Sequence, residues 1–377
     1  MSLIFKLASR NLFQDRIRFA GTVIGIVFSI VLVTIQLGLF LSFERMVTTM
    51  IDHASADLWI VPIGTKCFED PSLLDEQDRA QALSVHGVTA AIPVVIGFTQ
   101  WTVPSGGTTP VFVVGSNVEG AGLHPWNFVE GNLDALSTPD AVAIDQSYFG
   151  RLGVTRIGDT TEIRDQKAHV AAITNGIRSF TTTPYVFTSL DQAQSYMGAA
   201  STKVSYLLVH VAAGANIEST RHALLAILAK VEVLTPDEFS RRSRAFWLFG
   251  TGAGAALFAG ALLGAIVGTV IVAQTLYSST KDHLNEFATL RAIGSSSLYI
   301  HKVIIYQALL SAIIGFSVAA SIGLVIVRLT AESSLPIVMT LELTMGLFFL
   351  TVLMCIASSV SAIVQVMRID PARVFKQ

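Results

Sequence analysis

Four long runs of residues without a charged side chain divide this sequence. They cover residues 19–43, 245–280, 303–327 and 343–367. Each is longer than the roughly 20 residues that an apolar helix needs to cross a bilayer. A more polar block of about 200 residues separates the first run from the second, and it is long enough to bury a core of its own. The pattern predicts an integral membrane α-helical protein with four transmembrane helices and a large extracytoplasmic α/β (α+β) domain inserted between the first two.

The first run could also be part of a secretory signal. Its apolar stretch is longer than the roughly 7–15 residues of a signal core, and no small-residue cleavage site follows it. We therefore expect a retained anchor. Residues 1–18 mix apolar and basic side chains, as in a helix that lies along the inner leaflet, although a simple positive flank of the first span explains them equally well.

Lys and Arg residues predict which side of the membrane each segment faces, because they concentrate in cytoplasmic segments near the spans. The N-terminal segment, the loop 278–302 and the C-terminal tail together hold 10 basic and 4 acidic residues, whereas the block 42–245 holds 14 basic and 21 acidic ones. This difference places both termini and the loop inside and the block outside. Arg241, Arg242 and Arg244 argue the other way, but long translocated domains largely escape the charge rule.

These patterns give predicted boundaries along the chain. In order, they are a cytoplasmic interfacial helix (1–18), the first span (19–43), the extracytoplasmic domain (44–244), the second span with a stalk (245–277), a cytoplasmic loop (278–302), the third span (303–327), a short external loop (328–342), the fourth span (343–367) and a cytoplasmic tail (368–377).

The polar block has the pattern of a mixed domain. Runs rich in Val, Ile and Thr, bounded by Gly, Pro and Asp, predict strands at 58–61, 91–103, 111–115, 141–144, 170–174, 185–187 and 204–211. Helices are predicted at 75–84, 189–197 and 217–230. The second helix should begin with a capping box formed by Ser189 and Gln192. The sequence Pro-Trp-Asn-Phe at 125–128 is either a docking edge or a satellite cluster that packs its loop onto the domain.

The sequence shows no pattern for catalysis or metal binding. No Gly-x-Ser-x-Gly elbow and no Walker A pattern occurs, so if ATP drives this protein, another chain binds it. Cys67 and Cys355 fall in the polar block and the fourth run, so no disulfide framework is implied. We expect no enzyme activity, catalytic residue, cofactor or metal site in this chain. The histidines of the block lack metal-ligand spacing: His53, His86, His124, His169, His210 and His222.

Glycines recur every four residues in two of the apolar runs. Gly21 and Gly25 lie in the first run, and Gly260, Gly264 and Gly268 lie in the second. Small residues at this spacing form a ridge that allows the backbone of another helix to approach closely. We expect these ridges to pack helices and to join two copies of the chain in a homodimer.

Residues 276–302 form the long polar interruption between the second and third runs. Its apolar residues recur on one face of a short helix: Phe287, Leu290 and Ile293. Gly294 is a plausible C-terminal stop for this helix, and residues 295–297, all serines, can cap the next one. A bare connection between spans needs only a few residues. A short amphipathic helix held between two spans is therefore predicted to press on another component.

The whole-chain pattern resembles the FtsX/MacB-type permeases of ABC transporters, which have one span, a large external domain, three further spans and a polar helix in the second cytoplasmic loop. Residues 286–294 (Glu-Phe-Ala-Thr-Leu-Arg-Ala-Ile-Gly) are similar to the family's Glu-hydrophobic-Gly-x-Leu-Arg-Ala-hydrophobic-Gly coupling segment, with Ala288 in place of the usual glycine. Gln307 stands where many members carry Glu, so no proton or ion role is attached to it. Further similar segments are residues 10–12, the span with Gly21 and Gly25, 141–154, 184–198 and 370–372.

The resemblance implies a permease subunit of an ABC exporter in the cell inner (plasma) membrane. Two copies would pair among the membrane lipids, and two ATPase subunits, which bind ATP and Mg, would dock beneath. In the best-known members, ATP-driven closure moves the external domain by mechanotransmission. No nucleic acid partner is implied. Coupling to the ATPase would fall to Glu286, Phe287, Leu290, Arg291, Ile293 and Gly294.

Within the family, residues 35–38 and 178–187 look most like the DevC-type branch. Those permeases work with an ATPase and a membrane-fusion protein, and they export amphiphiles such as glycolipids. An outer-membrane channel is a further partner that this resemblance raises. Two alternatives remain at this point: extrusion of haem or porphyrin, and an FtsX-like scaffold whose external domain activates a cell-wall enzyme.

Overall fold

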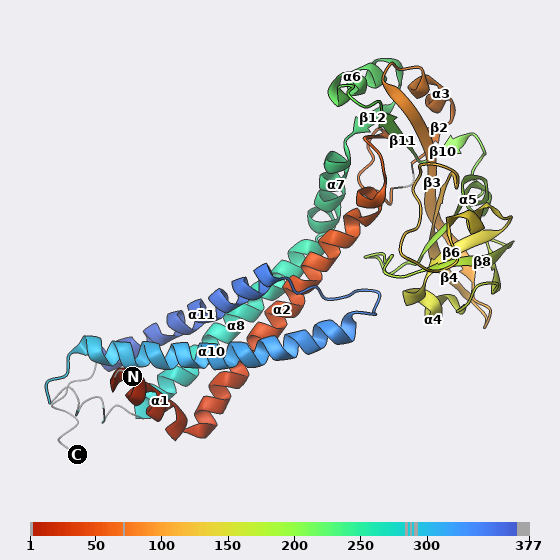
Figure 1. The fold of residues 1–377 in the computed structure, drawn as a ribbon. Coiled ribbons are helices and arrows are strands. Elements are labelled where there is room, and N and C mark those ends of the chain that lie inside the picture. Colours follow the sequence, from red (N-terminus) through yellow and green to blue (C-terminus); the bar gives the residue numbers. More distant parts are fainter. Residues whose placement is uncertain (1–2, 71, 283–285, 287–288, 290–292, 368–377) are drawn as a thin grey trace. The chain divides into compact units, whose positions relative to one another are not determined.

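The computed structural model describes residues 3–70, 72–282, 286, 289 and 293–367 (Figure 1). The chain forms two compact units. A helical unit comprises Met1–Leu41, Ala255–Ala331 and Pro336–Gln377, and a sheet unit comprises Ser42–Gly254 with Glu332–Leu335. The predicted tail, including the segment 370–372, lies outside the described residues.

The helical unit contains four helices that are long and apolar enough to span a membrane. Its elements are α1 (Leu3–Gln14), the first part of α2 (Arg16–His53), α8 (Ala253–Asp282), α10 (Ser297–Thr330) and α11 (Leu341–Met367). Buried apolar residues from these helices, among them Ile30, Val272, Ile304 and Cys355, form one core. Apolar side chains on the other helix faces are exposed, as expected of a protein whose solvent is lipid.

The helix α2 extends beyond the predicted run 19–43 at both ends. Its last part, residues 42–53, belongs to the sheet unit. Met46 and Met50 there are buried together with their neighbours Val47 and Ile51, which is the spacing of one apolar helix face. This amphipathic pattern explains why the helix continues past the end of the uncharged run.

The sheet unit is built on a ten-stranded mixed sheet with the order β12-β1-β11-β3-β4-β9-β6-β8-β5, and β7 pairs with both β3 and β8. The pairs β4·β9 and β6·β8 are parallel, and the others are antiparallel. The strands are β1 (Leu58–Pro62), β3 (Val88–Thr102), β4 (Thr108–Ser116), β5 (Phe128–Glu130), β6 (Ala141–Asp145), β7 (Thr160–Ile163), β8 (Gln166–Thr174), β9 (Tyr185–Ser189), β11 (Tyr206–Val211) and β12 (Val231–Leu234). Two short strands, β2 (Leu74–Asp75) and β10 (Lys203–Val204), pair separately.

Both faces of the sheet are covered, and side chains alternate between two cores as strand geometry requires. Leu58 and Ile60 of β1 point into one core, whereas Trp59 and Val61 point into the other. The first core is covered by α3 (Gln77–Leu83), α5 (Leu190–Met197) and α6 (Ile217–Ile227). The second is covered by α7 (Pro236–Arg244), the end of α2 and the loop that carries Phe68.

The predicted strands are confirmed, except that the strand 204–211 is interrupted at Ser205. The predicted helix 75–84 begins only at Gln77, because Leu74 and Asp75 pair with β10, and the predicted helix 217–230 ends at Ile227. The predicted capping box is wrong. Ser189 does occupy the N-cap of α5, but its side chain makes no capping hydrogen bond, and the Gln192 amide donates to Asp140 at 3.1 Å.

A capping box is present instead at the start of α7. The Thr235 side chain accepts from the backbone N–H of Glu238 at 3.3 Å, and the Glu238 carboxylate accepts from the backbone N–H of Thr235 at 2.9 Å. Pro236 follows at the first helical position, where its missing N–H leaves no hydrogen bond unmade. The sequence Thr-Pro-Asp-Glu at 235–238 is therefore a helix start signal of its own, with both hydrogen bonds of the capping box formed.

The predicted second span, 245–277, is not one continuous α-helix. Residues Ala245–Gly250 form a π-helical segment, and Gly252 adopts φ +78°, a left-handed conformation that glycine tolerates best. The regular helix α8 begins only at Ala253. The Thr251 hydroxyl donates to the Trp247 carbonyl at 2.5 Å and lies 3.4 Å from the backbone nitrogen of Ala253. The helix is thus interrupted within the uncharged run, at the left-handed Gly252.

The Pro-Trp-Asn-Phe sequence forms a satellite cluster. Trp126 and Phe128 are partly buried and pack against the second core of the sheet. The indole of Trp126 stacks on His53 at the end of α2, with ring centroids 3.8 Å apart and an interplanar angle of 9°. The loop is therefore packed down onto the domain, as one of the two sequence interpretations expects.

Candidate functional site

The described part of the segment between α8 and α10 has the predicted local structure. Glu286 and Thr289 are helical and exposed, and the backbone N–H of Ile293 donates to the Thr289 carbonyl at 3.0 Å, which is an α-helical hydrogen bond. Gly294 follows at φ +100° and ends the turn. The Ile293 side chain is 79% exposed, so the described part of the chain leaves this apolar residue largely uncovered.

The start of the next helix agrees with the predicted serine cap. Ser296 is the N-cap of α10, and its hydroxyl accepts from the backbone N–H of Tyr299 at 3.3 Å. Phe287, Leu290 and Arg291 lie outside the described residues. The contact of this segment with an ATPase therefore stays a prediction.

The glycine ridges pack α2 against α8 within one chain. Gly25 lies against Ile271, and Gly260 lies against the amide of Gln36. The amide of Gln36 thus lies against a neighbouring helix of the same chain. The two helices approach so closely that an added Cβ at either glycine would meet these side chains.

A hydrogen bond marks the closest part of this contact. The Ser29 hydroxyl of α2 donates to the Gly264 carbonyl of α8 at 2.7 Å. An added Cβ at Gly264 would lie 3.2 Å from Leu32 and Val33, and one at Gly268 would collide with Ser29 and with Met354 of α11. Gly21 is different, because among the described residues nothing outside its own helical turn lies within 4 Å of its added Cβ. The homodimer remains a prediction, and of the five ridge glycines Gly21 is the one that the described helices leave uncovered.

Two of the arginines that precede the second run are paired inside the sheet unit. Arg242 donates to Glu232 of β12 at 2.6 Å, and Arg244 lies 3.5 Å from Glu44. The Arg242 guanidinium holds the pKa of Glu232 below its usual range. Arg242 and Arg244 thus serve to hold α7 and the end of α2 within the sheet unit.

The ends of α2 and α7 are joined directly as well. The Ser240 hydroxyl donates to Asp52 at 3.2 Å, and Asp52 also accepts from Thr48 at 2.6 Å. Phe239 of α7 is fully buried beside Trp59 and Tyr206. These partners could not be found from the sequence, because they are far apart along the chain and match no short motif.

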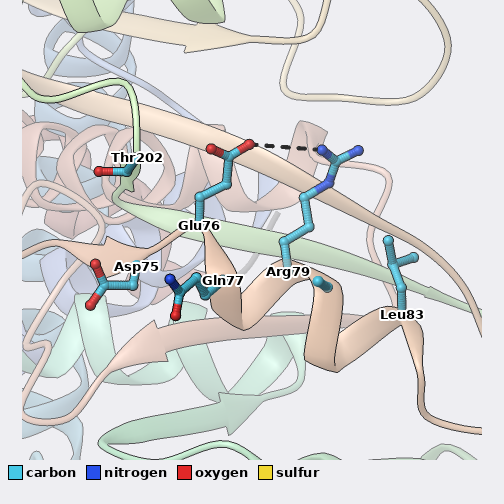
Figure 2. Close-up of a pocket in the computed structure, with 7 residues that line it drawn as sticks. Asp75, Glu76, Gln77, Arg79, Leu83 and Thr202 are labelled. Atoms are coloured by element: carbon cyan, nitrogen blue, oxygen red, sulfur yellow. Dashed lines mark ion pairs between the residues drawn. The ribbon is translucent and has the colours of Figure 1, made fainter.

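An open polar pocket of about 550 Å³ lies beside α3 (Figure 2). The carboxylate of Asp75 there pairs with Lys203 at 2.6 Å, and Glu76 faces Arg79 at 4.0 Å. Arg79 also donates to the Ala91 carbonyl at 3.0 Å. The charged side chains at this pocket are paired with opposite charges, as is usual on a solvated protein surface.

Within the described part of the chain, no group of three or more His, Cys, Asp or Glu side chains is placed to hold a metal ion. Of the histidines in the sheet unit, His53 stacks on Trp126, and His124 contacts the Asn117 carbonyl at 2.6 Å. These histidines are used in local packing.

Comparison with known protein families gives one match in the N-terminal part of the sequence and one in the C-terminal part. Residues 19–227 match the MacB-like periplasmic core domain, and residues 247–371 match the FtsX-like permease C-terminal domain. No curated protein sequence matches the chain.

Solved structures similar to the chain cover about half of it. The periplasmic region of MacB from Actinobacillus actinomycetemcomitans is 10% identical, and the match covers 51% of this chain and 94% of that one with a TM-score of 0.39. The extracellular domain of the noncanonic ABC-type transporter YknZ from Gram-positive bacteria is 16% identical, with 48% and 99% covered and a TM-score of 0.36.

The two family matches together account for most of the sequence, and four helices of the required length and hydropathy are present. The chain is accordingly a multi-pass membrane protein that belongs to the FtsX/MacB-type family of ABC transporter permeases.

Proposed function

We propose that this chain is the permease subunit of an ATP-driven exporter, in which ATP hydrolysis in a separate subunit moves the extracytoplasmic domain. The match of the chain to the MacB-like periplasmic core domain and to the FtsX-like permease C-terminal domain is the observation that carries the proposal. Family membership supports an ABC-type transmembrane subunit, and the segment 286–294 supports the way in which it is coupled. The exposed Ile293 and the helical turn before Gly294 are what a surface seated in a partner's groove requires.

The proposed topology places residues 44–244 outside the inner membrane and residues 278–302 inside. Arg242 and Arg244 are paired with acidic residues of the sheet unit, so they supply little free positive charge that would hold this end of the block in the cytoplasm. This pairing supports the orientation that the remaining Lys and Arg residues predict.

Single cysteines test this topology. We expect cysteines at Ser137 and Ser296, both exposed, to react with a membrane-impermeant maleimide from opposite sides of intact spheroplasts and inverted vesicles. The background should lack Cys67 and Cys355, which are buried and serve no disulfide. Labelling of both positions from one side would contradict the four-span topology.

We propose further that two copies of the chain form a homodimer through the face of α2 that carries Gly21. Ile24 and Phe28 lie on the same face at helical spacing and are 66% and 58% exposed. A small residue flanked by exposed apolar ones permits the close approach of a second helix.

Replacing Gly21 with leucine is expected to weaken the dimer by roughly tenfold or more while the chain still folds, because a Cβ added there meets no described neighbour of the same copy within 4 Å. Cross-linking and mass photometry in nanodiscs would measure the dimer fraction against concentration. Gly346→Leu in α11 is a matched control, since an added Cβ there also meets nothing within 4 Å. An unchanged dimer fraction in Gly21→Leu would place the interface elsewhere.

The proposed substrate class is a lipid, glycolipid or other amphiphile. The likeness of residues 178–187 to DevC-type permeases supports this class and also supports a membrane-fusion protein as a partner. Co-purification of the complex, followed by identification of bound chains and lipids by mass spectrometry, tests both points. Stoichiometric haem without enrichment of any lipid would favour haem export, and a cell-wall hydrolase as the retained partner would favour a signalling scaffold.

A further inference from the structure

A buried carboxylate joins three segments of the sheet unit. Glu69 lies in the loop between β1 and β2 and is 6% exposed. The indole N–H of Trp247 donates to its Oε2 at 3.0 Å, and the hydroxyl of Tyr185 in β9 donates to its Oε1 at 3.3 Å. The loop itself is fixed by the Tyr206 hydroxyl, which donates to the Phe68 carbonyl at 2.8 Å. Glu69 therefore connects a well-anchored loop and the sheet to the segment that carries Trp247.

The segment that Glu69 holds is irregular. Trp247 lies in the π-helical segment Ala245–Gly250, which is followed by the left-handed Gly252. π-helical turns occur mostly as local insertions at functional positions, and segments without regular helical hydrogen bonds open more readily than their surroundings. Besides this hydrogen bond, the indole packs in a cluster with Met46, Val47 and Phe180, and its ring lies 4.7 Å from that of Phe180. Glu69 thus accepts a hydrogen bond from the side chain that seats this segment against the sheet unit.

The surroundings of Glu69 disfavour its negative charge. Burial is the largest cause that raises the pKa of Glu69 from 4.5 to about 7, and it outweighs the hydrogen bonds from Trp247 and Tyr185, which lower that pKa. Burial likewise raises the pKa of Cys67 to about 12 and the pKa of Tyr185 and Tyr206 well above the usual range. The titratable and charged groups around this cluster are Cys67, Asp70, Tyr185, Tyr206, Tyr148 beside Tyr185, and Lys66 over the ring of Phe246.

We propose that Glu69 is a proton-controlled latch for the π-helical segment. The protonated side chain stays buried and keeps Trp247 seated against the sheet unit. The ionised side chain favours release of the segment, because release lets water reach the carboxylate. The latch rests on contacts inside one unit, and only its use in transport would rest on the proposed function.

The sign of the pH dependence follows from proton linkage. Glu69 binds its proton more tightly in the seated state, where its pKa is about 7, than in a released, solvated state near 4.5. The stabilisation of the seated state is therefore complete below about pH 4.5 and is lost as the pH rises to about 7. Above that pH, the free-energy difference between the seated and the released state no longer changes with the protonation of Glu69.

Hydrogen exchange of the full-length protein in nanodiscs tests the latch. After correction for intrinsic exchange rates, the opening of residues 245–252 should increase by roughly tenfold or more between pH 5 and pH 8. Glu69→Gln should stay closed and independent of pH, because the neutral amide still accepts from Trp247. Glu119→Gln, at an exposed position, is a matched control that should keep the wild-type pH dependence.

A second variant keeps the test decisive if Glu69→Gln does not fold. Trp247→Phe retains an aromatic ring against Phe180 but loses the N–H donor, so the segment should be more open than in wild type at every pH. Equal opening of Trp247→Phe and wild type would overturn the latch, as would a pH-independent wild type or a pH-dependent Glu69→Gln. Exchange is measured without ATP or a partner, so these results do not depend on the proposed function.

Discussion

Replacing Gly268 with leucine is expected to destabilise the helical unit by about 3 kcal/mol, the upper end of the usual effect of overpacking. An added Cβ there collides with the Ser29 side chain of α2 and with Met354 of α11, so two helices would have to move. Their separation would also stretch the hydrogen bond from Ser29 to the Gly264 carbonyl, which is buried. Thermal unfolding in a fixed detergent, with helix content and aggregation followed together, measures the effect.

Gly21→Leu is the matched control for this prediction. It makes the same change in the neighbouring helix, but there the added Cβ meets nothing within 4 Å among the described residues outside its own helical turn. We expect its unfolding temperature as a monomer to equal that of wild type within about 2 °C, because exposed substitutions away from contacts have small effects. Equal loss of stability in Gly268→Leu and Gly21→Leu would show that α2 and α8 do not pack through the ridge glycines.

The sequence was a good guide to the elements whose pattern is local. Uncharged runs, alternation of apolar residues and turn residues are set by the immediate environment of each segment, and they located the long helices and the longer strands. The strands of the ten-stranded sheet that the sequence does not predict, β5, β7 and β12, are three or four residues long. Such short segments acquire their structure from pairing with a neighbouring strand. The short strand β7, for example, pairs with Trp101 and Thr102 of β3.

The helix break after residue 244 shows where a composition pattern fails. Ala245–Gly250 and the residues that follow are as apolar as a spanning helix, so the uncharged run continues through them. Hydropathy does not distinguish an α-helix from a π-helical turn. Gly250 and Gly252 were visible in the sequence, but glycines are also frequent in regular spanning helices, and Gly260, Gly264 and Gly268 in the same run do lie within one.

The residues around Glu69 could not be predicted from the sequence for a different reason. Trp247 and Glu69 are separated by 178 positions, and Tyr185 and Glu69 by 116. A carboxylate in a loop of an external domain is expected on a solvated surface. Only the fold brings the loop, β9 and the π-helical segment together, and burial of the carboxylate follows from that arrangement.

Replacing Phe287 and Leu290 together with alanine is expected to abolish coupling to the ATPase. Both are predicted to lie on the apolar face of the segment whose described residues Glu286 and Thr289 are helical and whose Ile293 is 79% exposed. Apolar anchors seated in a partner's groove carry most of the docking energy, and losing two of them is expected to cost about 2–4 kcal/mol. Affinity for the ATPase should fall by roughly thirtyfold or more, and export and stimulation of ATP hydrolysis should fall with it.

The protein itself should remain folded, because the described residues of the segment, Glu286, Thr289 and Ile293, are all exposed. Phe258→Ala with Leu262→Ala is a matched control: these residues of α8 are 61% and 56% exposed, and their loss should leave ATPase binding unchanged. ATPase affinity in nanodiscs, ATP turnover and dimer fraction should be measured for both pairs. Because docking and stimulation depend on the same anchors, they must fall together while the dimer persists. If the Phe287 and Leu290 variant still binds and stimulates the ATPase, the segment only connects α8 to α10, and the force that moves the permease must enter through another surface.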